Sequence, residues 1–333
     1  MKGFVFEEDR IRKEIYRLDA KRVLLQLPEG LKPAAPRLAQ TIAKTGATVI
    51  ISADPCYGAC DIAFPDAAVL GIDLIVHFGH ARIAKHEKIP TIYVEARSNL
   101  SLITAVKKAI PLLKDRHTIG LALAVQHIHS LEQAHVTLVR AGKVVLIGDM
   151  GVLAYAGQVT GCDYSNVRSI AKDVEAFLFI GGGRFHAIGV ALATGKLTIV
   201  ADPYENQAYS VNDEAQKILK LRWNCVIEAK DAKTYGILIG LKPGQSHLEE
   251  ALKIKSKIEE KGLTAYLLTA REITPEALME FPSIEAYINT ACPRISLDAP
   301  QKFGKPVLTI KEFGVVSGES SWENLLKEGL FEN

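Results

Sequence analysis

The pattern of apolar runs in this 333-residue chain repeats three times, and this repeat limits the possible fold more than any other feature. Each repeat begins with an apolar run typical of a strand, continues through a helical stretch that ends at a glycine, and enters a second apolar run. Glycine just past a helix is the usual left-handed cap, so it marks where each helix ends. The first runs are residues 23–27, 119–123 and 235–239, the glycines are Gly46, Gly142 and Gly262, and the second runs are residues 47–51, 144–147 and 264–268.

A third and a fourth apolar run complete each repeat. Continuous runs of Val, Ile and Leu between turns are typical of strands buried on both faces. Strands that alternate with helices predict parallel sheets with helical crossovers. We therefore expect an α/β fold of three repeated parallel-sheet domains, at residues 1–110, 111–210 and 211–333. The third runs are residues 73–78, 176–180 and 285–288, and the fourth runs are residues 91–94, 197–200 and 306–309.

Each repeat carries one cysteine at the same edge of its predicted sheet. Cys60, Cys162 and Cys292 all follow a predicted strand, and ligands of parallel sheets bind beyond the carboxyl ends of the strands. The three cysteines are too far apart in sequence for a local metal loop, so the fold would have to bring the thiols together. Three thiolates are one short of the four that close an iron–sulfur cube. Such a cluster would leave one iron open to a small molecule at a centre shared by the domains.

The other two cysteines have less defined roles. Cys56 shares a loop with Cys60, where Gly58 and small residues let the backbone approach a bulky ligand, although a tight turn with incidental thiols fits as well. Cys225 lies in an apolar segment, where a buried inert thiol is expected. Structural zinc usually takes pairs of closely spaced ligands. Only Cys56 and Cys60 form such a pair, and the nine histidines form no ligand motif, so zinc is the weaker alternative.

Composition narrows the class of protein further. The net charge of +2 argues against direct binding of nucleic acid. No apolar run approaches the roughly 20 residues that span a membrane. Residues 1–21 are charged and helix-like rather than a secretory signal. We therefore expect a cytoplasmic protein, in which cysteines serve as metal ligands, reactive groups or buried thiols rather than in disulfides.

Four short motifs allow comparison with a known family. They resemble the radical enzymes of diphthamide biosynthesis, the 2-(3-amino-3-carboxypropyl)histidine synthases, and the similarity extends from about Arg22 to Gly318. The resemblance implies a [4Fe–4S] cluster held by Cys60, Cys162 and Cys292, with Cys56 as an extra thiol beside the family position. The motifs are Leu27-Pro28-Glu29-Gly30-Leu31, Tyr57-Gly58-Ala59-Cys60-Asp61, Gly161-Cys162 and Asn289-Thr290-Ala291-Cys292-Pro293-Arg294.

The same resemblance implies the reaction. S-adenosylmethionine would be the co-substrate, and an electron from an external donor would lead to cleavage of its sulfonium at Cγ, with methylthioadenosine as by-product. The 3-amino-3-carboxypropyl fragment would pass to one histidine of elongation factor 2, the first step of diphthamide biosynthesis. The enzyme would be a homodimer. The usual radical motif Cys-x3-Cys-x2-Cys is absent, because Ala63 occupies the place of its third cysteine.

Several residues at the same rim are candidates for contact with S-adenosylmethionine, although the sequence identifies no catalytic residue. Arg294 could pair with the substrate carboxylate as a fork. Gln245 and His247 stand at the start of a predicted helix, where backbone N–H groups favour an anion. Gly79, Gly182 and Gly183 leave room for a closely packed ligand. Each of these residues also has a simpler role as a turn or cap residue.

Two other functions fit part of the pattern. Quinolinate synthase also resembles this plan of three repeats with a three-cysteine cluster, but the motifs at residues 57–61 and 289–294 favour the diphthamide family. A non-enzymatic electron carrier would normally close its cluster with a fourth ligand. The open iron therefore favours an enzyme.

Overall fold

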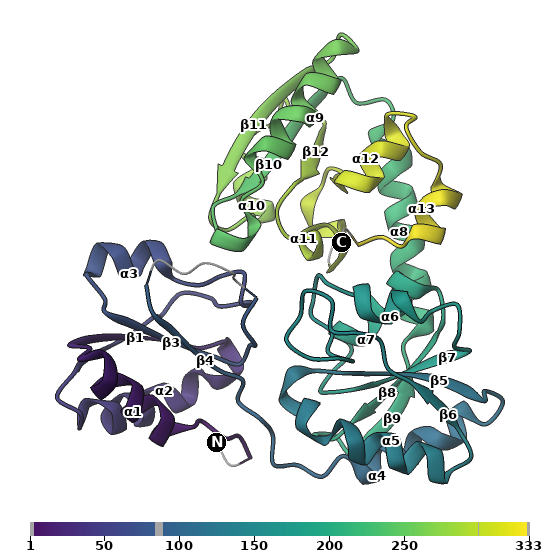
Figure 1. The fold of residues 1–333 in the computed structure, drawn as a ribbon. Helices are drawn as coiled ribbons and strands as arrows, with labels where there is room; N and C mark the ends of the chain where they lie inside the picture. The colour runs from purple at the N-terminus through teal and green to yellow at the C-terminus, as the bar shows by residue number, and fades with distance from the viewer. Residues whose placement is uncertain (1–2, 84–88, 299, 332–333) are drawn as a thin grey trace.

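The chain folds into three α/β lobes, each built on its own sheet, as the computed structural model shows for residues 3–83, 89–298 and 300–331 (Figure 1). The first sheet has the order β2-β1-β3-β4, and the other two repeat this order of second, first, third and fourth strand. All pairings among these four strands are parallel in every sheet. The three-fold repeat of parallel sheets predicted from the sequence is therefore confirmed.

The strands begin and end within one or two residues of the predicted runs. The first sheet contains β1 (Arg22–Gln26), β2 (Thr48–Ile51), β3 (Leu74–Phe78) and β4 (Thr91–Val94). The second contains β5 (Thr118–Leu123), β6 (Val144–Leu146), β7 (Ala176–Ile180), β8 (Leu197–Asp202) and β9 (Gln207–Ser210). The third contains β10 (Thr234–Gly240), β11 (Thr264–Ala270), β12 (Ala286–Asn289) and β13 (Val307–Thr309).

The helices pack on these sheets, and the three predicted capping glycines all adopt left-handed φ values. A 3-10 helix at Glu29–Ala34 precedes the first crossover helix, where the sequence predicted one continuous helical stretch. The helices are α1 (Glu8–Leu18), α2 (Ala35–Ala43), α3 (Phe64–Leu70), α4 (Ile103–Ala109), α5 (Leu131–Arg140), α6 (Ser165–Ser169), α7 (Phe185–Thr194), α8 (Asn212–Ala229), α9 (Leu248–Glu260), α10 (Pro275–Met279), α11 (Pro293–Asp298), α12 (Ile310–Val316) and α13 (Trp322–Glu328). Among the described helices, none is long and apolar enough to cross a membrane.

Two details of the sheets differ from the sequence prediction. The edge strands β2, β6 and β11 are partly exposed rather than buried on both faces. The central strands β3, β7 and β12 are buried throughout. The second sheet also gains β9, which pairs antiparallel with β8 and has no counterpart in the predicted pattern.

Segments near the ends of the lobes pack against a neighbouring lobe. Helix α4 contacts β8 and β9 of the second sheet, and Leu330 and Phe331 near the C-terminus join the core around Tyr164 in the second lobe. The predicted boundaries of the three domains stay a prediction.

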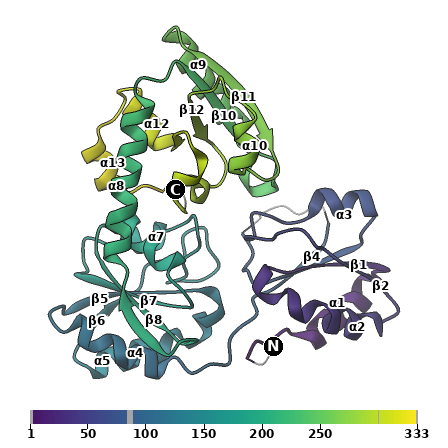
Figure 2. The same ribbon diagram turned by 180° about the vertical axis from the view of Figure 1, so that it is seen from behind.

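Helix α8 runs from the second lobe to the third (Figure 2), and a buried ion pair fixes it there. The guanidinium of Arg222 donates to both carboxylate oxygens of Glu312, over 2.8 and 2.5 Å, and neither side chain is exposed. Arg222 also donates to the backbone carbonyls of Ser296 and Val307, both over 2.7 Å. Glu312 in turn caps helix α12 by accepting from the backbone N–H of Thr309. One buried arginine thus joins α8 to three segments of the third lobe.

Candidate metal centre

The three lobes each direct one cysteine-bearing loop to a shared centre. Cys60 lies between β2 and α3, Cys162 between β6 and α6, and Cys292 between β12 and α11. All three thiols are half-buried. Burial raises the pKa of Cys292 to about 12, with further contributions from the nearby thiols of Cys162 and Cys60. Burial and the Cys60 thiol likewise raise the pKa of Cys162. The fold therefore brings together the three thiols that the sequence analysis singled out.

The Cys60 loop of the first lobe is held by the turn that follows β10 in the third lobe. Gly244 donates its backbone N–H to the carbonyl of Cys60 over 2.8 Å, and the side-chain amide of Gln245 donates to the Cys60 sulfur over 3.3 Å. The ammonium of Lys242 lies 3.3 Å from the carboxylate of Asp61 and 4.2 Å from the ring centroid of Tyr57. These contacts fix Cys60 from the side of the third lobe.

Close packing at Gly244 leads to a first testable prediction. A Cβ on Gly244 would lie 2.7 Å from the Cα and Cβ of Cys60, so Gly244→Ala must push the Cys60 loop away. Overpacking of this kind typically costs about 1–3 kcal/mol. We expect a matching loss in the free energy of unfolding by urea, together with faster alkylation of Cys60 measured by mass spectrometry. The matched control is Gly314→Ala in helix α12, where an added Cβ meets no heavy atom within 4 Å. Equal behaviour of both variants would contradict the prediction.

The Cys292 turn is held by its own motif. Asn289 donates its side-chain amide to the carbonyl of Cys292 over 2.7 Å and accepts from the backbone N–H of Ala291 over 2.9 Å. The hydroxyl of Thr290 donates to the carbonyl of Leu238 on the neighbouring strand β10 over 2.8 Å. The motif residues before Cys292 thus fix the direction of its loop.

Arg294 lies beside the thiols with part of its guanidinium unpaired. Its guanidinium carbon is 3.8 Å from the centroid of the Phe185 ring, and its Nη2 forms a 2.5 Å ion pair with Asp298. Its positive charge lowers the pKa of Cys162 and Cys292, although the effect of burial is larger. Nε and Nη1 are buried without a hydrogen-bond partner among the described residues. Leaving such donors unsatisfied costs free energy, so they are well suited to a carboxylate ligand.

Three histidines, of which His77 is buried and His80 and His186 are half-buried, line the same region in their neutral form. Burial lowers the pKa of His80 and of His186 to about 4, and it lowers the pKa of His77 well below its usual value. Arg294 and His80 contribute to the lowering at His186, which places these groups near one another. At neutral pH these rings therefore offer lone pairs rather than positive charge.

One cluster of ligands was missed by the sequence analysis. Cys56, His77 and His80 each place one ligand atom within 4.8 Å of the others, and Cys56 and His77 are fully buried. The sequence analysis found no ligand motif among the histidines, whereas the fold brings His77 and His80 within reach of Cys56. Their spacing at the end of β3 is a signal that could have been noticed, but only the fold shows that the Cys56 loop lies against them. Cys225, expected to be buried, is half-buried on α8 and accepts from Arg222 over 3.6 Å.

The three predicted glycines all have local structural reasons. Gly79 has a φ of 84°, and an added Cβ would lie 2.8 Å from Pro28. A Cβ on Gly182 would lie 2.8 Å from the ring of Tyr204. Gly183 has a φ of 72° and donates its N–H to Asp202 over 2.9 Å. Their contact with a ligand stays a prediction.

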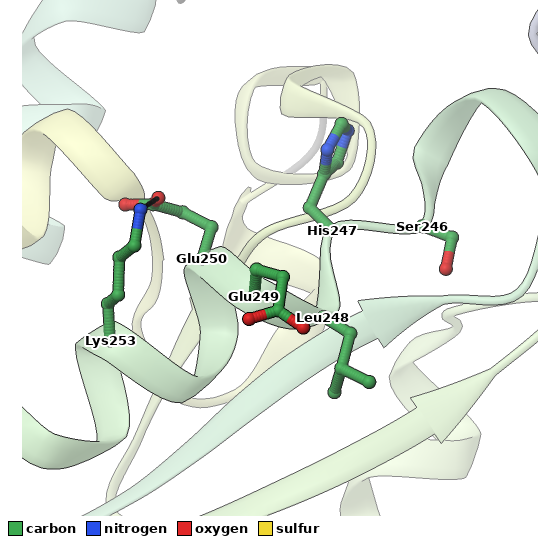
Figure 3. Close-up of a pocket in the computed structure, with 6 residues that line it drawn as sticks. All are labelled: Ser246, His247, Leu248, Glu249, Glu250 and Lys253. Carbon is green, nitrogen blue, oxygen red and sulfur yellow. Dashed lines mark ion pairs between the residues drawn. The ribbon is translucent and has the colours of Figure 1, made fainter.

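Gln245 and His247 differ in their relation to the thiols. Gln245 lies in a 3-10 turn before α9 and contacts the Cys60 sulfur directly. His247 is exposed in a shallow surface pocket of 380 Å³ at the first turn of α9 (Figure 3). Two carboxylates, Glu249 and Glu250, line the same pocket and disfavour an anion there. The role of His247 in binding an anion stays a prediction.

Comparison with known proteins identifies the family. A family model described as "Putative diphthamide synthesis protein" matches residues 27–326. The 2-(3-amino-3-carboxypropyl)histidine synthase of Pyrococcus horikoshii is 37% identical over 314 residues, which cover 93% of this chain and 90% of that protein. Subunit 1 of the human enzyme of the same name is 28% identical over 96% of this chain and 74% of its own length.

A solved structure has the same fold. The crystal structure of Dph2 from Pyrococcus horikoshii with a 4Fe-4S cluster superimposes with a TM-score of 0.89 at 34% sequence identity, covering 98% of this chain and 94% of that one. This chain therefore belongs to the diphthamide synthesis family.

Proposed function

We propose that this protein is a 2-(3-amino-3-carboxypropyl)histidine synthase that holds a [4Fe–4S] cluster through Cys60, Cys162 and Cys292. The observation that carries the proposal is the convergence of one thiol from each lobe at the carboxyl ends of three parallel sheets. The crystal structure of the related Dph2 with a 4Fe-4S cluster supports it.

The surroundings of the thiols fit a cluster with one open corner. Gln245 donates a neutral hydrogen bond to the Cys60 sulfur, which is typical of protein groups that tune cluster sulfur. The two remaining cysteines are engaged elsewhere: Cys56 faces His77 and His80, and Cys225 contacts Arg222. The described residues thus supply three thiol ligands at this centre, and the open corner would receive S-adenosylmethionine.

These positions indicate which parts of the reaction the cluster and the protein side chains would each perform. When bound, the reduced cluster supplies the electron for cleavage of the sulfonium at Cγ, and the protein supplies binding and orientation. Arg294 would hold the methionyl carboxylate with its two unpaired N–H donors. The rings of His80 and His186 are neutral, so they add no positive charge of their own beside the substrate sulfonium. The fragment would pass to a histidine of elongation factor 2.

A turnover experiment tests the reaction. With dithionite and S-adenosylmethionine, the anaerobic protein should release methylthioadenosine and little 5′-deoxyadenosine. When elongation factor 2 is added, mass spectrometry should show an aminocarboxypropyl group on one of its histidines. Dominant 5′-deoxyadenosine would contradict cleavage at Cγ. An unmodified elongation factor, with methylthioadenosine still released, would contradict the protein substrate alone.

A substitution at Arg294 tests how the co-substrate is held. Arg294→Gln removes the charged fork, and hydrogen bonds to charged groups contribute about 1.5–3 kcal/mol. We expect KM for S-adenosylmethionine in methylthioadenosine release to rise by about 10- to 100-fold, with a smaller change in kcat. The matched control is Arg184→Gln, since Arg184 is half-exposed and pairs with Glu214 on α8. An unchanged KM in Arg294→Gln would refute the carboxylate contact.

The assembly and location of the protein follow from the same proposal. All three ligands lie on one chain, so a homodimer needs no different subunit, and light scattering should give about twice 36.3 kDa. An external electron donor would reduce the cluster. Reduction and the modification of a translation factor both suit the cytoplasm.

A further inference from the structure

A second group of possible metal ligands lies in the first lobe and includes none of the three thiols of the proposed cluster. Cys56 comes from the loop between β2 and α3, whereas His77 and His80 come from the end of β3 and the turn after it. Cys56 is 1% exposed and His77 is not exposed. Three ligand atoms from two separate segments thus meet in a buried place.

The spacing of these atoms suits a tetrahedral ion. The Nε2 of His77 and the Nδ1 of His80 form a 3.0 Å hydrogen bond, so a bound ion would take the place of the proton that these two nitrogens share. Two nitrogens bound to the same tetrahedral zinc at about 2.0–2.1 Å stand roughly 3.3 Å apart, so small ring movements would admit the ion. One thiolate and two imidazoles form a donor set that zinc favours over magnesium or calcium.

A hydrogen-bond chain orients the first imidazole toward such an ion. Gln26 donates its amide to the carbonyl of Asp61 over 2.6 Å, and its oxygen accepts from the backbone N–H of Ala63 over 3.2 Å. The same oxygen lies 3.0 Å from the Nδ1 of His77, so this nitrogen carries the proton and donates it. The lone pair of His77 therefore resides on Nε2, the atom that faces His80. Metal-bound histidines are usually fixed by an outer partner in this way.

We propose that Cys56, His77 and His80 bind one zinc ion, with a water molecule in the fourth position, at a site that shares no ligand with the iron–sulfur cluster. The ion would tie the loop of residues 52–63, which carries Cys60, to strand β3. It would fix this loop from the side of the first lobe, as Gly244 and Gln245 do from the side of the third.

Zinc analysis of the cluster-loaded protein tests the site. Anaerobic protein is given one equivalent of zinc, dialysed, and assayed for zinc and iron by mass spectrometry. We expect about one zinc per chain at unchanged iron content. X-ray absorption at the zinc edge should show one sulfur at about 2.3 Å and two imidazole nitrogens at about 2.0–2.1 Å. Zinc bound to several sulfurs with loss of iron would mean that it had displaced the cluster, which would overturn the proposal.

Substitutions test whether the zinc binds at this site rather than at other thiols. Cys56→Ser and His80→Gln should each lose the zinc while they keep their iron, which also shows that they remain folded. Gln26→Ala should weaken zinc binding by about 10- to 100-fold, because it removes the outer partner of His77. Cys225→Ser is the matched control and should keep the zinc. Zinc content in Cys56→Ser equal to that of the unaltered protein, or no zinc in the unaltered protein, would refute the site.

Discussion

Single substitution of Cys60, Cys162 or Cys292 by alanine is expected to reduce the iron of the anaerobically purified protein to near background. Each lobe contributes one proposed ligand, so removal of any one leaves two thiolates from two lobes. Two ligands cannot hold a cube that already lacks its fourth. Iron analysis and electron paramagnetic resonance of the dithionite-reduced protein measure the effect. We expect S-adenosylmethionine cleavage to be lost in parallel.

The other two cysteines serve as controls for this result. Cys225→Ala should keep its full iron content, because that thiol contacts Arg222 on α8. Cys56→Ala should have a smaller effect on iron than the three ligand variants, because Cys56 faces His77 and His80. Full clusters in all three ligand variants would show that the ligand assignment is wrong.

The second large effect is expected on stability. Arg222→Met leaves the carboxylate of Glu312 buried without its partner, and breaking a buried pair in this way typically costs about 3–5 kcal/mol. Urea unfolding followed by tryptophan fluorescence suits this measurement. Both tryptophans of the chain, Trp223 and Trp322, lie near the pair, with their ring centroids 5.1 Å apart. We expect the free energy of unfolding to fall by that amount.

A double substitution separates the loss of the pair from the loss of packing. When Arg222→Met is combined with Glu312→Leu, no buried charge is left alone, and apolar replacements of buried pairs are often neutral. The double variant should therefore recover part of the lost free energy of unfolding, although the hydrogen bonds to the carbonyls of Ser296 and Val307 stay broken. If the double variant loses as much free energy of unfolding as the two single variants together, the two side chains act independently.

The strands were predictable because the physics that forms them is local. The central runs at residues 74–78, 176–180 and 286–289 are mostly apolar and are buried on both faces. The β9 strand could not be predicted in this way. Its residues Gln207–Ser210 carry no apolar run, and it forms through its antiparallel pairing with β8. Exposure of the edge strand β2 likewise depends on the strand order, which the local sequence does not determine.

The candidate site likewise has features that the sequence predicts and features that depend on the three-dimensional fold. The gathering of Cys60, Cys162 and Cys292 follows in part from repetition, because all three loops leave the carboxyl ends of parallel strands, although Cys60 and Cys162 follow the second strand of their sheets and Cys292 follows the third. The meeting of Cys56 with His77 and His80 depends on how one loop folds over one strand, and no repeat predicts it. Unpaired donors, such as those of Arg294, can be identified only once every neighbouring acceptor is placed.

The division of the three thiols among three lobes also determines when the protein can mature. A ribosome releases the first lobe, with Cys60, long before it reaches Cys292 near the end of the chain. Until the third lobe has folded against the second, two of the proposed ligands stand ready and the third does not yet exist. Cluster insertion would therefore wait until Cys292 has been synthesised and its lobe has folded, and a product that stalls before Cys292 would lack one of the three proposed ligands.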